Sequence, residues 1–104
     1  MLLLQIVGWF FSGAFLANAV PHFVMGATGR RFPTPFASPP GRGLSSPVVN
    51  VVWGFANLVV GILLAPVGEY ARLLSTPGLA TAAGFLLMGV FLAWHFGALE
   101  EPRS

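Results

Sequence analysis

Three long apolar runs, separated by polar segments rich in proline and glycine, dominate the pattern of the chain. They cover residues 2–20, 47–65 and 79–99, and none of them contains Arg, Lys, Asp or Glu. Each is about 20 residues long, the length that an α-helix needs to cross the hydrocarbon core of a bilayer. Because backbone groups in lipid must bond to one another, such runs have to be helical. The pattern predicts an all-α membrane protein with three transmembrane helices.

Proline and small polar residues mark where these helices begin and end. Ser46 followed by Pro47 is typical of a helix start, because the hydroxyl accepts a free N–H and proline lacks one. Pro66 is expected to follow the end of the second helix. Pro21 is expected to end or kink the first helix by freeing the carbonyl of Ala17. Asn18 is close enough to help satisfy that carbonyl.

A long loop, residues 26–46, joins the first two helices and is rich in proline and glycine. Proline-rich chain favours extended conformations, so this segment is predicted not to be helical. It is either a disordered linker or an ordered loop at the membrane interface. Phe32 and Phe36 favour order, because solvated linkers seldom carry aromatic residues.

Composition supports a single integral membrane domain over residues 1–104. Hydrophobic residues make up 56% of the chain and charged residues 8%, against about 25% charged in soluble domains. So short a chain has too small an interior to bury that much apolar surface. Five basic residues are too few for a nucleic-acid footprint, so no nucleic-acid partner is expected. The absence of cysteine excludes disulfides and thiolate metal sites.

The arginines predict the orientation. Arg30, Arg31 and Arg42 lie in the first loop, and loops rich in arginine stay cytoplasmic. We therefore expect the first loop and the C-terminus to be cytoplasmic and the N-terminus outside, in a bacterial inner membrane. The same arginines are candidates for contacts with anionic lipid. Ala-Asn-Ala at positions 17–19 resembles a signal-peptidase site, but no basic residue precedes the apolar run, so we expect it to be retained.

Polar and small residues form stripes on the first two helices. An asparagine in hydrocarbon is costly unless it is hydrogen-bonded, so these stripes are expected to face each other, with glycines allowing close approach. The second helix carries Asn50, Gly54, Asn57 and Gly61; the first carries Gln5, Gly8, Ser12, Ala19 and His22.

The third helix has two candidate packing faces. Gly89, Ala93 and Gly97 form a ridge of small residues, and Gly84 and His95 lie on the opposite side. One face can pack within the chain, which leaves the other for a second subunit. The sequence does not choose between them. It does predict a homo-oligomer or a larger membrane complex.

His22 and His95 are the residues with the clearest capacity for redox or metal chemistry. Two imidazoles from two helices can bind a haem or pigment, but two ligands do not define a metal site, and the cofactor stays unknown. The alternative is that each histidine is a hydrogen-bonding anchor. Trp53 and Trp94 are expected to be interfacial anchors.

These patterns favour a structural or accessory membrane subunit that packs helices and can also bind lipid. A redox subunit that binds haem or pigment through His22 and His95 is one alternative. A small oligomeric channel or transporter lined by Asn50 and Asn57 is another, although ionisable residues at the midplane, which usually mark such paths, are missing. No Ser, His and acid fall together, so an enzyme is not expected.

Overall fold

The protein is mostly helical, and three of its helices are long and apolar enough to cross a membrane. The computed structural model describes residues 3–72 and 74–100. Leu2, the predicted start of the first helix, and residues 101–104 lie outside this range. The elements in chain order are α1 (Leu3–Ala27), β1 (Phe32–Pro33), β2 (Leu44–Ser45), α2 (Pro47–Leu64), the 3-10 helix η1 (Gly68–Ala71) and α3 (Thr76–Glu100).

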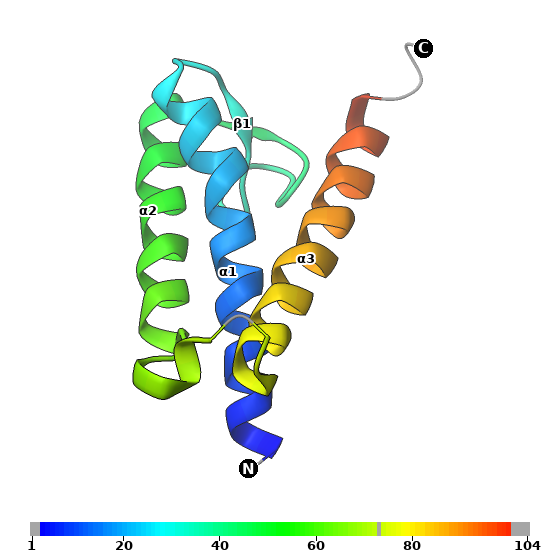
Figure 1. The fold of residues 1–104 in the computed structure, drawn as a ribbon. Helices are drawn as coiled ribbons and strands as arrows, with labels where there is room; N and C mark the ends of the chain where they lie inside the picture. Colours follow the sequence, from blue (N-terminus) through cyan, green and yellow to red (C-terminus); the bar gives the residue numbers. More distant parts are fainter. Residues whose placement is uncertain (1–2, 73, 101–104) are drawn as a thin grey trace.

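The helices run up, down and up, with α1 in the middle (Figure 1). α2 packs antiparallel along one side of α1, and α3 packs parallel along the other, while α2 and α3 make few contacts with each other. The connection between α1 and α2 and the end of α3 lie at one end of the bundle, and η1 lies at the other (Figure 1). α1 is thus the element on which both other helices depend.

The first helix is longer than predicted, because it continues through Pro21 to Ala27. Proline removes one helical hydrogen bond but does not forbid a helix that packing holds together. Here the last turn of α1 packs closely on α2, since a Cβ at Gly26 would lie 2.7 Å from the backbone nitrogen of Val51. The Thr28 hydroxyl then donates to the carbonyls of the last turn, at 2.9 Å from Met25 O.

Helix α2 begins as predicted, with Pro47 in its first turn and the Val49 N–H donating to Ser46 Oγ at 3.2 Å. It ends at Leu64, just before Pro66. Helix α3 begins slightly earlier than expected, at Thr76.

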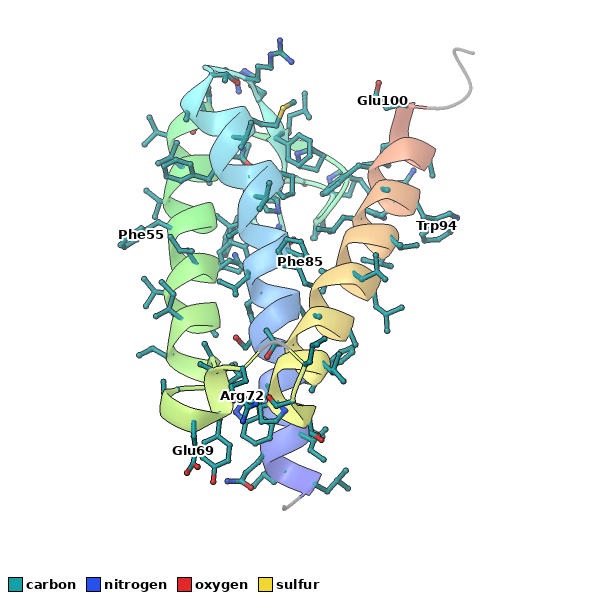
Figure 2. The ribbon with its side chains drawn as sticks, in the orientation of Figure 1. Phe55, Glu69, Arg72, Phe85, Trp94 and Glu100 are labelled. Carbon is teal, nitrogen blue, oxygen red and sulfur yellow. The ribbon has the colours of Figure 1, made fainter. Side chains whose placement is uncertain are left out.

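The interior is polar and the surface apolar. Buried polar residues outnumber the large buried hydrophobic ones; the former are Ser12, His22, Thr34, Ser45, Asn50 and Asn57. Phe55 and Trp94 project outward from α2 and α3, whereas Glu69, Arg72 and Glu100 lie at the ends of the bundle (Figure 2). This distribution is the one expected when lipid rather than water surrounds the helices.

Candidate functional site

A line of polar contacts joins α1 to α2. Ser12 Oγ donates to the carbonyl of Gly61 at 2.7 Å, and Asn18 Nδ2 donates to Asn57 Oδ1 at 3.0 Å. The residues that α2 buries are the polar and small ones of its predicted stripe, namely Asn50, Gly54, Asn57 and Gly61.

The stripe on α1 is shorter than the sequence indicated. Gln5 is exposed, and no atom lies within 4 Å of a Cβ at Gly8. The reason is geometric: Ser12 already meets Gly61, which is one turn from the end of α2 at Leu64. The two helices are antiparallel, so residues of α1 more than about one turn before Ser12 extend beyond the end of α2.

Asn50 is the centre of the polar site. Its Nδ2 donates to the carbonyls of Phe32 at 3.0 Å, Ser46 at 3.1 Å and Ser45 at 3.3 Å. These three acceptors fix the orientation of the amide, so Oδ1 is the atom that faces His22 Nδ1 at 2.9 Å. His22 Nδ1 must therefore carry the proton and donate, which leaves Nε2 of the neutral ring as an acceptor.

The connection between α1 and α2 is hydrogen-bonded to the start of α2. Phe32 pairs with Ser45 in the antiparallel sheet. The hydroxyls of Thr34 and Ser45 lie 2.5 Å apart, and the Thr34 carbonyl accepts the Gly41 N–H at 2.8 Å. Thr34 is only 1% exposed. The connection thereby covers the end of the polar line at Asn50.

His95 brings α3 into the same site. Its Nε2 lies 2.8 Å from the carbonyl of Gly41, and because a carbonyl only accepts, Nε2 carries the proton and Nδ1 is left as an acceptor. The ring of Phe96 contacts both imidazoles, with centroids 6.1 Å from His22 and 5.2 Å from His95. The structure thus gathers the two predicted histidines, separated by an aromatic ring.

Both histidines line one small cavity of about 120 Å³. The polar residues around it come from all three helices and from the connection: Asn18, His22, Thr34, Gly41, Trp53 and His95. Among the residues that the structure describes, Trp53 Nε1 is the one buried side-chain donor or acceptor without a hydrogen-bond partner.

Trp53, predicted like Trp94 to be an interfacial anchor, packs partly inside the chain. The Trp53 ring lies edge-on to Phe36, with centroids 5.0 Å apart, and within 6.5 Å of the His22 centroid. It is therefore part of the polar site. Trp94 is 68% exposed on the outside of α3 (Figure 2).

The site offers hydrogen-bonding chemistry rather than a metal-ligand set. It has two imidazole acceptors whose tautomers are fixed by Asn50 and Gly41, and the indole N–H of the neighbouring Trp53 is buried without a partner. Within residues 3–72 and 74–100, no group of three or more His, Cys, Asp or Glu is placed to hold a metal ion. At about 120 Å³, the cavity is well below the roughly 300–1,000 Å³ of pockets that enclose drug-sized ligands.

The remaining predicted residues lie away from this cavity. Arg30, Arg31 and Arg42 are exposed in the connection. On α3, Gly84 packs against α1, whereas Gly89, Ala93 and Gly97 are exposed, with no atom within 4 Å of a Cβ at either glycine.

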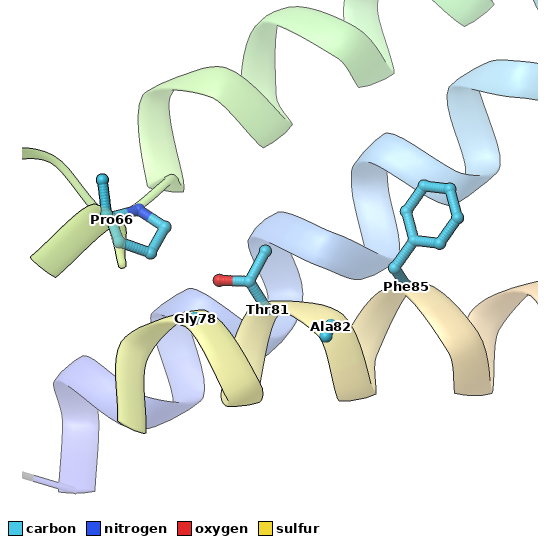
Figure 3. Close-up of a pocket in the computed structure, with 6 residues that line it drawn as sticks. Pro66, Gly78, Thr81, Ala82 and Phe85 are labelled. Atoms are coloured by element: carbon cyan, nitrogen blue, oxygen red, sulfur yellow. The ribbon is translucent and has the colours of Figure 1, made fainter. Parts of the chain in front are cut away.

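A larger hollow, about 400 Å³, lies at the beginning of α3 (Figure 3). It is lined by Pro66, Ala71, Gly78, Thr81, Ala82 and Phe85. None of these side chains is titratable. It is a packing gap between elements and offers no chemistry comparable to the polar cavity.

Sequence reasoning missed the contributions of Thr34, Gly41 and Ser45. No local signal sets them apart, because the connection also carries other hydroxyl residues, namely Thr28, Ser38 and Ser46. The chain matches no family model, no curated protein and no solved structure.

Proposed function

We propose that the protein is a structural subunit of a membrane assembly, in which α3 packs against a second copy of the chain or another membrane protein. The observation that carries this proposal is the open ridge of Gly89, Ala93 and Gly97. Glycine inside a helix costs about 1 kcal/mol relative to alanine. The two ridge glycines make no close contact within the chain, so a neighbouring helix is what would offset that cost, by close backbone approach.

The internal hydrogen bonds favour this proposal over a channel. Asn50 and Asn57 are 0% and 2% exposed, and their amide groups bond to His22, Asn18 and backbone carbonyls. They stabilise the contact of α1 with α2 and are not available to line a path between subunits. The small volume of the cavity likewise gives little support to a haem or pigment held between His22 and His95.

Orientation belongs to the same proposal. We propose that the connection with its three arginines lies on the cytoplasmic side of a bacterial inner membrane, together with the end of α3. What supports it is that Arg30, Arg31 and Arg42 are all exposed at the end of the bundle where α3 finishes (Figure 1). In that position they are available to anionic headgroups.

Native mass spectrometry and crosslinking in a mild detergent test the proposal. Wild type is expected as an oligomer or with a co-purifying membrane partner. Gly97→Leu should abolish this association, because a large side chain on the ridge separates the helices. The matched control is Ala98→Leu, which changes an exposed neighbour about 100° around the helix and should leave association intact. A wild-type chain that is strictly monomeric and partner-free would contradict the proposal.

A further inference from the structure

The connection between α1 and α2 folds back along the helices instead of extending beyond their ends (Figure 1). The ring of Phe32 packs on His22, with centroids 5.4 Å apart. His22 lies five residues before the end of α1, which is about 7–8 Å at the rise of an α-helix. The carbonyl of Gly41 meets Nε2 of His95 at 2.8 Å, five residues before the end of α3. The connection therefore lies at the depth of the last turns of both helices.

Helix α2 is shorter than the layer that it has to cross. Its 18 residues span about 27 Å at the rise of an α-helix, whereas the hydrocarbon core of a bilayer is about 30 Å thick. Helices α1 and α3, with 25 residues each, are long enough to cross it. Non-helical chain next to α2 has to complete the crossing. The connection, which directly precedes Pro47, lies at the depth where it would do so.

The outward surface of the connection is apolar and continues that of α2. Phe36 is 66% exposed, and it lines a groove of about 250 Å³ together with the exposed Val48 and Val52 of α2. All the residues that line this groove are hydrophobic. Leu44, 61% exposed, adds a second large apolar side chain. Acyl chains that cover the outer face of α2 would cover Phe36 and the groove as well.

The backbone of the connection suits a place beside lipid, where unpaired N–H groups are costly. Over residues 35–43, three positions are proline and have no N–H to satisfy. Five other N–H groups donate within the connection: those of Phe36 and Ala37 to Thr34, that of Gly41 also to Thr34, and those of Arg42 and Gly43 to Pro39. The connection thus satisfies most of its own donors without water.

We propose that the connection is seated in the leaflet at the boundary between headgroups and acyl chains, with Phe36 and Leu44 inserted among the acyl chains. Its partner is the hydrocarbon of the surrounding lipid, which fills the groove between Phe36 and α2. The long side chain of Arg42, exposed in the connection, can reach back to the headgroups. This inference rests on the proposed placement of the three helices across a bilayer, but it does not depend on what α3 packs against.

Spin labels at single cysteines measure the depth of the connection, because the chain has no cysteine of its own. Full-length Phe36→Cys and Leu44→Cys are each labelled with a nitroxide and reconstituted in phosphatidylcholine vesicles. Electron paramagnetic resonance then compares relaxation by oxygen, which concentrates in hydrocarbon, with relaxation by a nickel chelate, which stays in water. Both labels are expected to respond more strongly to oxygen than to nickel. Leu44→Cys keeps the Phe36 ring, so the test does not rely on a variant that lacks it.

Two reference labels calibrate the response. Arg31→Cys, exposed in the same connection, is expected among the headgroups and should respond mainly to nickel. Phe55→Cys, on the outer side of α2 (Figure 2), is expected in the hydrocarbon and should respond mainly to oxygen. A Phe55 label that responds mainly to nickel would contradict the placement of the helices in the bilayer, and the proposal would fail with it.

Two results would overturn the proposal while the helices stay in the bilayer. In the first, the Phe55 label responds to oxygen, but the label at Phe36 or Leu44 responds to nickel as strongly as the one at Arg31, so the connection lies in water. In the second, the labels at Phe36 and Leu44 respond to neither reagent, which would show that protein and not lipid covers this face.

Discussion

The contact between α1 and α3 depends on two glycines, and this dependence gives the sharpest stability prediction. A Cβ at Gly84 would overlap the carbonyl oxygen of Phe10, and a Cβ at Gly13 would overlap that of Thr81. In both cases the obstacle is backbone, which cannot rotate aside as a side chain can. In Gly84→Ala the two helices therefore have to move apart, and the packing around Leu92 is loosened with them.

The magnitude follows from a matched substitution on the same helix. Overpacking costs about 1–3 kcal/mol, and a backbone obstacle places Gly84→Ala near the upper end. Glycine to alanine in a helix by itself gains roughly 0.5–1 kcal/mol. Within the single chain, Gly89→Ala receives only this gain, since no atom outside its own stretch of helix lies within 4 Å of its Cβ position. We expect Gly84→Ala to be less stable than Gly89→Ala by about 2–3 kcal/mol.

The free energy of unfolding of both variants is measured by steric trapping or by reversible unfolding in mixed micelles, with helix content followed by circular dichroism. Wild type should fall between the two variants. Equal unfolding free energies for Gly84→Ala and Gly89→Ala would show that α1 and α3 do not cross at these glycines.

Other predictions concern the polar site, the lipid contacts and the orientation. Asn50→Leu should lower the free energy of unfolding by about 2–4 kcal/mol, because it removes the acceptor of the buried His22 N–H and three hydrogen bonds to backbone carbonyls. Exposed Val52→Leu should change little, and equal effects would contradict the role of Asn50. Arg30→Gln with Arg31→Gln should reduce the anionic lipid retained in native mass spectrometry, and unchanged retention would refute lipid contact. Because the chain has no cysteine, Ser38→Cys provides a single site for labelling. An impermeant maleimide should reach this site only from the cytoplasmic side. Labelling in intact cells would show that the connection lies outside and would contradict the proposed orientation.

The helices and the buried face of α2 could be predicted because few conformations suit a long apolar run that carries asparagine. A long uncharged run must be helical, and an asparagine within it must find a partner, which places Asn50 and Asn57 on the inner face. Their partners were harder to predict. Ser12, Asn18 and His22 are spaced so that the antiparallel neighbour meets each in turn, but the end of α2 at Leu64 sets how far along α1 these contacts reach.

The rest depended on long-range packing that local pattern does not encode. Pro21 indicated a helix end or a kink, yet the helix continues to Ala27, where Gly26 packs closely on α2. The position of Trp53 in the sequence indicated an anchor, yet in the fold its ring lies beside Phe36 of the connection and near His22. His95 is likewise bound by Gly41, a residue more than fifty positions earlier in the chain.

The central place of α1 has a consequence for biogenesis. α1 is the first of the three helices to be synthesised, and each later helix packs mainly on α1. A nascent chain can therefore assemble by sequential docking, with every new helix meeting a neighbour that has already been made. Moving the α1 segment behind α3 in a circular permutant would leave α2 and α3 without the helix on which both pack until the end of synthesis.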